Sequence, residues 1–262
     1  MQQCCKINFC KCGKSPKNLT LIFVTAIMMY IQLHDLNKYE KHYGKICTVW
    51  IAPYFFNALV LMAFSLIAVA LFSNAPFYDG YAVFAISKAG RGAWYAGAIL
   101  YIVCAAGLWA VLICAIPFIV GVNCLDYSLK LNSAIFGNIG NLSLAEAELI
   151  SFLLIWLVTL WTGLLNMFCN VVIKRGSGVA ISSFLCLFAY LINIYPPFNK
   201  SMYISPVSWM NIRNLNWTGE ASNYPHFWYA CAFIVATGTL MMLSGWFYFS
   251  RHEIKSVKVG VI

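Results

Sequence analysis

The sequence predicts an all-α membrane protein in which six transmembrane helices form one bundle. Of its 262 residues, 62% are hydrophobic and only 10% are charged, whereas soluble globular domains carry about 25% charged residues. Six stretches, five of them long, contain no charged residue. A helix that crosses a hydrocarbon core needs about 20 apolar residues, and a charge at its centre costs roughly 2.5–3.5 kcal/mol. The predicted spans are residues 19–33, 49–72, 94–122, 149–172, 179–194 and 227–249.

The first span, residues 19–33, is the shortest, about 22 Å long as a helix. One alternative is an interfacial segment, which would leave five spans. Another is a signal peptide, because basic residues precede the apolar run. No small-residue cleavage site stands before Gln32 and His34, so we predict that this segment is retained as a span.

The remaining spans are justified by their boundaries. The third, residues 94–122, is longer than the core requires and can tilt. A short basic turn at residues 173–178 makes the fourth and fifth spans an antiparallel hairpin. The fifth span ends before Pro196 and Pro197, because proline removes a backbone donor and disfavours helical geometry in the residue before it.

The segment between the fifth and sixth spans, residues 198–226, is too polar to span and unusually rich in Trp and Tyr. One interpretation is a partly re-entrant segment, which requires that protein or a wet cavity surround its irregular backbone. The other is a surface loop that lies flat on the lipid headgroups. The sequence does not decide between them.

A single transmembrane domain is expected over residues 19–249, between a basic, cysteine-rich tail at 1–18 and a second tail at 250–262. With six spans, the side that carries both tails holds eleven Lys and Arg against two acidic residues, and the other side holds six of each. Because cations stay on the cytoplasmic side, we predict a plasma-membrane protein with both termini cytoplasmic. With five spans and the rest of the orientation kept, seven cations would lie on the cytoplasmic side and ten on the outside. The opposite orientation of the bundle would then be permitted.

Several classes of function are excluded by missing residue patterns. The chain has no phosphate-binding loop, no HExxH or GxSxG motif and no paired Asp within a predicted span, so we expect no catalytic residue, no metal site and no cofactor in it. A net charge of +9 without a soluble basic face does not indicate nucleic acid, and the expected surroundings are a lipid bilayer. The N-terminal thiols fit a metal site or palmitoylation, but an incidental role is favoured; they are Cys4, Cys5, Cys10 and Cys12.

Four uncharged polar residues lie within predicted spans: Asn57, Asn166, Asn170 and Asn193. Hydrogen bonds between helices are the favoured interpretation, each worth less than about 2 kcal/mol. A polar lining of a substrate path is the alternative.

The run FSNAPFYDGYAVFAISKAGRGAWYAGAILYIV at residues 72–103 resembles the permease subunits of type-2 ATP-binding-cassette transporters, particularly small antibiotic- and bacteriocin-type ones. Lys88 stands where those proteins are expected to have Arg. The runs SPVSW at 205–209 and WFYFSRHEI at 246–254 resemble the same family. Many of those proteins begin with an amphipathic helix before the first span, and the chain departs from them in that residues 1–18 are short and rich in Cys and Lys.

The resemblance implies that two permease subunits, identical or different, pair in the membrane. Each would dock a cytoplasmic ATPase subunit, which holds the ATP and Mg, through a coupling helix formed by residues 81–91. Tyr81, Lys88 and Arg91 are its candidate contacts, although anchoring of cations on the cytoplasmic side explains the last two equally well. Pro206 and Trp209 are candidates for an external gate over the path of an exported peptide, antibiotic or lipid-like substrate.

Two other functions remain open from the sequence. A membrane immunity or assembly factor of the same topology would work without nucleotide turnover. A passive channel or carrier would need a polar lumen, for which the spans are too apolar within one chain.

Overall fold

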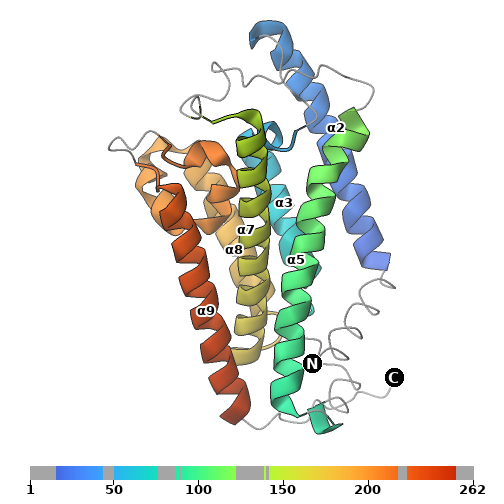
Figure 1. Ribbon diagram of the computed structural model, residues 1–262, viewed down its shortest axis with the longest axis vertical. Helices are drawn as coiled ribbons and strands as arrows, with labels where there is room; N and C mark the ends of the chain where they lie inside the picture. The colour runs from blue at the N-terminus through green and yellow to red at the C-terminus, as the bar shows by residue number, and fades with distance from the viewer. Residues whose placement is uncertain are drawn as a thin grey trace.

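The computed structural model describes residues 16–43, 50–75, 86–88, 90–121, 139, 142–217 and 223–251 (Figure 1). Within these ranges the chain forms six α-helices and four short 3-10 helices, and its extended pairing is limited to one isolated bridge between Asn216 and His226. Five of the α-helices are long and apolar enough to cross a membrane. The prediction of an all-α membrane bundle is therefore confirmed at this level.

The first helix, α2, runs from Pro16 to Tyr43 and is longer than the predicted span at 19–33. Proline suits the first turn of a helix, where the missing N–H group has no partner to lose. The apolar part, Pro16–Leu36, has 21 residues and measures about 32 Å along its axis. The helix is therefore long enough to cross a membrane, although the uncharged residues 19–33 alone are not.

The predicted second span at 49–72 is wrong as one continuous helix. A 3-10 helix, η1 (Ala52–Phe56), comes first, and the backbone is extended at Asn57 with φ −84° and ψ 118°. The α-helix that follows, α3 (Ala58–Phe72), has 15 residues and measures about 22 Å. Pro53 in the first turn of η1 and the Asn57 side chain, which accepts the N–H of Leu59 at 3.0 Å, account for the break.

The other four helices match predicted spans closely: α5 is Arg91–Gly121, α7 is Leu144–Val172, α8 is Ser177–Ile194 and α9 is Phe227–Arg251. α7 begins five residues earlier than predicted because Ser143 and Glu146 form a capping box. The Ser143 hydroxyl accepts the N–H of Glu146 at 3.3 Å, and the carboxylate of Glu146 accepts the N–H of Ser143 at 2.7 Å.

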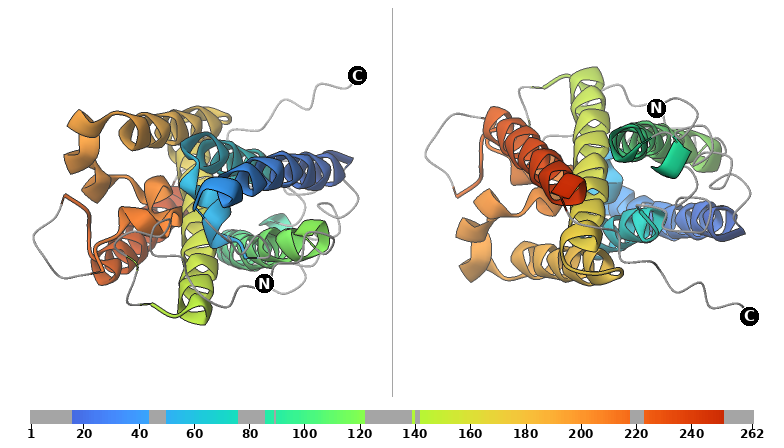
Figure 2. Two further views of the ribbon diagram at one scale, coloured as in Figure 1. Left: turned by 90° about the horizontal axis from the view of Figure 1, so that it is seen from above. Right: turned by 90° about the horizontal axis from the view of Figure 1, so that it is seen from below.

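α7 lies at the centre of the bundle and packs against α3, α5, α8 and α9. Figure 2 shows it between two groups, with α2, α3 and α5 on one side and α8 and α9 on the other. Outward-facing apolar side chains, among them Phe23, Leu108 and Leu240, are exposed on the surrounding helices. This distribution suits a bundle whose outer surface meets lipid.

Successive helices run in opposite directions, so their termini gather at two ends of the bundle (Figure 1). We call one the basic end: it holds the start of α2, the end of α3, the start of α5, the α7–α8 turn and the end of α9. Contacts join these segments, since Lys17 Nζ donates to Ser73 Oγ at 2.6 Å and Asn170 Nδ2 donates to the Ala75 carbonyl at 2.6 Å. The charged side chains that the structure describes there are Lys17, Lys88, Arg91, Lys174, Arg175 and Arg251.

The opposite end carries balanced charge among its described side chains, which are Asp35, Glu146, Glu148, Lys38, Lys200 and Arg213. Over it lies the cap, which we define as the 3-10 helices η4 (Pro196–Ile204), η5 (Pro206–Met210) and η6 (Ile212–Asn214). The cap packs against α8, α7, α3 and α9. All of η5 is buried, so the protein surrounds this irregular backbone.

Candidate functional site

The start of α5 lies at the basic end, where the resemblance places a coupling helix. Residues 86–88 are helical, and Gly90 makes the turn into α5 with φ +82°, a conformation that favours glycine. Lys88 is exposed, and Arg91 is half-buried with its Nη1 donating to the Ser250 carbonyl near the end of α9 at 3.4 Å. Tyr81 and most of the predicted coupling helix lie outside the described residues.

Aromatic rings pack the first turns of α5 against the last turns of α9. The ring of Trp246 lies against Gly92, where an added Cβ would meet its Cη2 at 2.7 Å. In return, the hydroxyl of Tyr95 lies against Gly245 and donates to the Met242 carbonyl at 3.1 Å. We call this reciprocal contact, Gly92 and Tyr95 of α5 with Gly245 and Trp246 of α9, the clasp.

A stacked pair of rings extends the clasp toward the basic end. Trp94 stacks on Phe249 with ring centroids 5.3 Å apart, and Tyr95 stacks on the same Phe249 at 5.8 Å. Trp94, Tyr95 and Phe249 are all buried. Such aromatic pairs are each worth about 0.5–1.5 kcal/mol beyond their buried area. The start of α5 is thereby fastened to α9.

Asn170 joins three segments at the basic end. Its side-chain oxygen accepts the N–H groups of Gly176 and Gly178, both at 3.0 Å, and its amide nitrogen donates to the Ala75 carbonyl. Gly176 occupies the N-cap position of α8 with φ +91°, where it has no side chain to cap the helix. Asn170 of the neighbouring helix supplies that cap.

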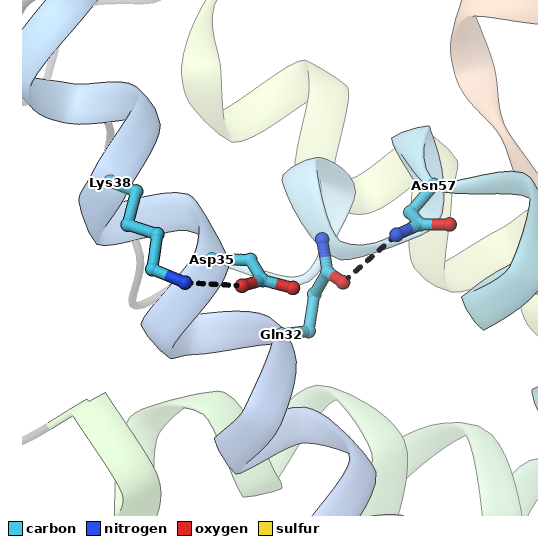
Figure 3. Close-up of polar contacts among 4 residues, drawn as sticks. All are labelled: Gln32, Asp35, Lys38 and Asn57. Carbon is cyan, nitrogen blue, oxygen red and sulfur yellow. Dashed lines mark hydrogen bonds and ion pairs between the residues drawn. The ribbon is translucent and has the colours of Figure 1, made fainter.

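Two further asparagines make contacts between segments. Asn57 Nδ2 donates to Gln32 Oε1 on α2 at 3.2 Å (Figure 3). Asn193, near the end of α8, donates to Ser208 Oγ at 3.2 Å, and its oxygen accepts from Asn214 Nδ2 at 2.7 Å. Asn193 therefore ties α8 to the cap.

Asn166 differs from the other three. It is fully buried on α7, and its Nδ2 donates only to the Thr162 carbonyl of its own helix at 3.2 Å. Its Oδ1 has no hydrogen-bond partner among the residues that the structure describes, and the same holds for Ser182 Oγ on the adjacent α8. Both atoms are buried, and a buried polar atom without a hydrogen-bond partner costs free energy.

The cap is organised around Trp209, which is fully buried. Its Nε1 donates to the Met202 carbonyl at 2.7 Å, and its ring meets the Phe233 ring of α9 edge-on with centroids 5.4 Å apart. Pro206 is also buried and begins η5. The two candidate gate residues thus lie together in one short helix against the transmembrane helices.

Glu148 is a site residue that the sequence analysis missed. It stands one position before the uncharged run at 149–172, and the early start of α7 places it inside the bundle, half-buried. Its Oε1 accepts the N–H of Ala52 at 3.2 Å, so it holds the start of η1. The position of Glu148 beside the uncharged run was the only hint in the sequence. It does not show that the side chain of Glu148 points into the bundle.

The described residues contain no group of three or more His, Cys, Asp or Glu side chains that could hold a metal ion. Cys104, Cys114, Cys169, Cys186 and Cys231 are free thiols within the helices. The cysteines of the N-terminal tail, with the metal and palmitoylation hypotheses for them, lie outside the described residues.

Comparison of the chain with protein-family models, with curated proteins and with solved structures found no match in any of the three.

Proposed function

We propose that this chain is the permease subunit of an ATP-binding-cassette transporter, which exports a peptide, antibiotic or lipid-like substrate with energy from a separate ATPase subunit. The observation that carries the proposal is the position of Lys88 and Arg91. They lie at a bundle end whose described side chains include no carboxylate. Lys88 stands just before α5, Arg91 is the first residue of that helix, and α5 is fastened to α9. A partner that binds there would act on α5 and α9 together.

The arrangement of the two ends supports this function. The basic end presents exposed Lys88 just before α5, which suits an acidic protein surface, and exposed Lys174 and Arg175 in the α7–α8 turn, which suit lipid phosphates. The opposite end is covered by the cap, whose buried Pro206 and Trp209 lie against α9. A substrate that leaves along the bundle would have to pass this cap. Its chemical class is inferred from the resemblance to antibiotic- and bacteriocin-type permeases.

In this proposal the basic end faces the cytoplasm and the cap faces outward, in the plasma membrane. The short helix α3 crosses the bundle inside a shell of α2, α7 and α8, so it needs no full-length contact with lipid and provides the sixth crossing. A protease site inserted after Arg175 tests the orientation. It should be cut in inverted membrane vesicles and protected in right-side-out vesicles, and the reverse result would contradict the proposal.

The docking experiment measures how tightly the proposed ATPase subunit binds the permease in lipid nanodiscs. Lys88→Glu should weaken binding strongly, because it reverses a charge at the docking point. Lys174→Glu is the matched control, since it makes the same change at an exposed position of the same end but in the α7–α8 turn, outside the proposed docking point at the start of α5. Equal binding by all three proteins would assign Lys88 to membrane anchoring alone. Function that persists with an inactive ATPase would favour the immunity or assembly factor.

A further inference from the structure

We propose that α9 transmits movement from the basic end to the cap, with Tyr95, Gly245 and Trp246 as the positioning residues that connect it to α5. This inference rests on the proposed function for its role in transport. Its physical content, a mechanical connection between the clasp and the cap, is testable in the isolated chain.

The clasp is a reciprocal fit that resists sliding. Each helix presents a glycine to a ring of the other, Gly92 to Trp246 and Gly245 to Tyr95. The two rings also touch each other, with centroids 5.7 Å apart. Because a ring seated on a glycine cannot move along the helix without meeting the next side chain, α5 and α9 must shift together at this point.

α9 continues from the clasp as one α-helix of 25 residues without proline. It is held to α7 partway along, where Trp161 Nε1 donates to Thr237 Oγ1 at 2.9 Å. A Cβ added at the neighbouring Gly238 would meet only the end of the Leu164 side chain of α7, at an ordinary contact distance of 3.4 Å, so this crossing does not depend on the glycine. The hydrogen bond from Trp161 to Thr237 fixes a crossing point about which α9 is able to tilt.

The other end of α9 packs against the cap. The rings of Phe233 and Tyr229 each form a T-shaped pair with Trp209, at centroid distances of 5.4 and 6.2 Å. The Tyr229 hydroxyl donates to the Tyr203 carbonyl of η4 at 3.2 Å. Gly245 and Phe233 are about 18 Å apart along the helix axis. A tilt of α9 imposed at the clasp therefore displaces the groups that pack Trp209.

Alanine substitutions on α9 separate the clasp from the rest of the helix. Gly245→Ala places a Cβ against the Tyr95 hydroxyl, whereas Gly238→Ala meets only the end of the Leu164 side chain and serves as the matched control. Tyr95→Phe removes the atom that the new Cβ meets, and the next neighbours, Phe168 Cδ2 and Tyr95 Cζ, lie at 3.5 Å. The double variant Tyr95→Phe/Gly245→Ala should therefore restore the fit.

The first measurement is hydrogen–deuterium exchange of cap peptides in the isolated chain, held in lipid nanodiscs. Gly245→Ala should change the exchange rate of η4 and η5 amides by roughly 2- to 30-fold, the range by which single residues alter coupling between distant sites. Gly238→Ala should leave it unchanged, and the double variant should return it toward the wild-type rate. A change confined to the α5 and α9 peptides at the clasp would overturn the inference. Equal effects of the two glycine variants would also overturn it.

The second measurement repeats the exchange in the complex with the ATPase subunit, with and without ATP and Mg. The wild-type cap should respond to ATP, and Gly245→Ala should reduce that response while ATPase binding persists. A wild-type complex whose ATPase is active but whose cap does not respond would contradict the inference alone. A chain that neither binds nor stimulates an ATPase, yet shows the coupling in isolation, would contradict only the proposed function. A Gly245→Ala chain that does not fold is replaced by Tyr95→Phe, which removes one hydrogen bond without adding an atom.

Discussion

The side-chain oxygen of Asn170 accepts the backbone N–H of Gly178 at 3.0 Å, so a residue near the end of α7 caps the start of α8. The same side chain holds the segment after α3 through the Ala75 carbonyl. The basic end therefore depends on one buried amide that connects three parts of the chain. A residue that the sequence presents as one of four similar asparagines has a distinct structural role.

Replacing Asn170 by Ala should lower the free energy of unfolding by at least about 2 kcal/mol, because it leaves buried backbone groups without partners. Thermal unfolding in detergent, followed by tryptophan fluorescence, measures the change. Asn57→Ala is the control. Asn57 is exposed and also caps a helix, so its loss should cost about 1 kcal/mol. Equal losses in the two variants would contradict the role given to Asn170.

Gly178→Ala should prevent the α7–α8 hairpin from closing. The added Cβ would collide with the backbone of Asn166, which has no flexible end that moves aside. We expect little folded protein after purification by size exclusion in detergent. Gly107→Ala, whose Cβ would lie 3.5 Å from Trp156 Nε1, should purify like the wild type. Normal yields of Gly178→Ala would show that the helices are farther apart than described.

Glu148→Ala should destabilise the protein by about 1–3 kcal/mol, since it leaves the buried N–H of Ala52 without an acceptor. Glu148→Gln keeps an oxygen in the same place and should retain most of the stability. Thermal unfolding of the two variants at one pH compares them. If Gln were as damaging as Ala, the negative charge rather than the hydrogen bond would hold η1.

Asn166→Leu should leave stability unchanged or raise it by about 1 kcal/mol, because the buried Oδ1 is without a partner in the described structure. Thermal unfolding tests this directly. Transport measured on the same variant separates the two interpretations of Asn166. Lost transport with retained stability would assign it to the substrate path, and a drop in stability would assign it a structural contact.

The sequence predicted most of the helices because lipid excludes charge from their centres, and α5, α8 and α9 follow the uncharged runs closely. It failed where polar side chains act locally. The side-chain oxygen of Asn57 caps a helix that begins within an apolar run. The capping box at Ser143 starts α7 before the uncharged run, so that the helix includes two glutamates. Uncharged runs do not encode either feature.

The contacts at the candidate site were less predictable than the spans. Arg91 was expected on the same side as the two tails, but its bond to Ser250 depends on the packing of helices far apart in sequence. The fit of Tyr95 on Gly245 has the same origin. The fold of the cap depends on hydrogen bonds such as that from Trp209 to Met202, which no periodic pattern in the sequence predicts.

ATP hydrolysis by the proposed ATPase subunit, measured with and without this chain in liposomes, tests the central claim most directly. The account predicts that the wild-type chain changes the hydrolysis rate severalfold and that Lys88→Glu abolishes the change, while Lys174→Glu preserves it. A rate that is the same with the chain, without it and with either variant would contradict the assignment of this protein as an ATP-driven permease.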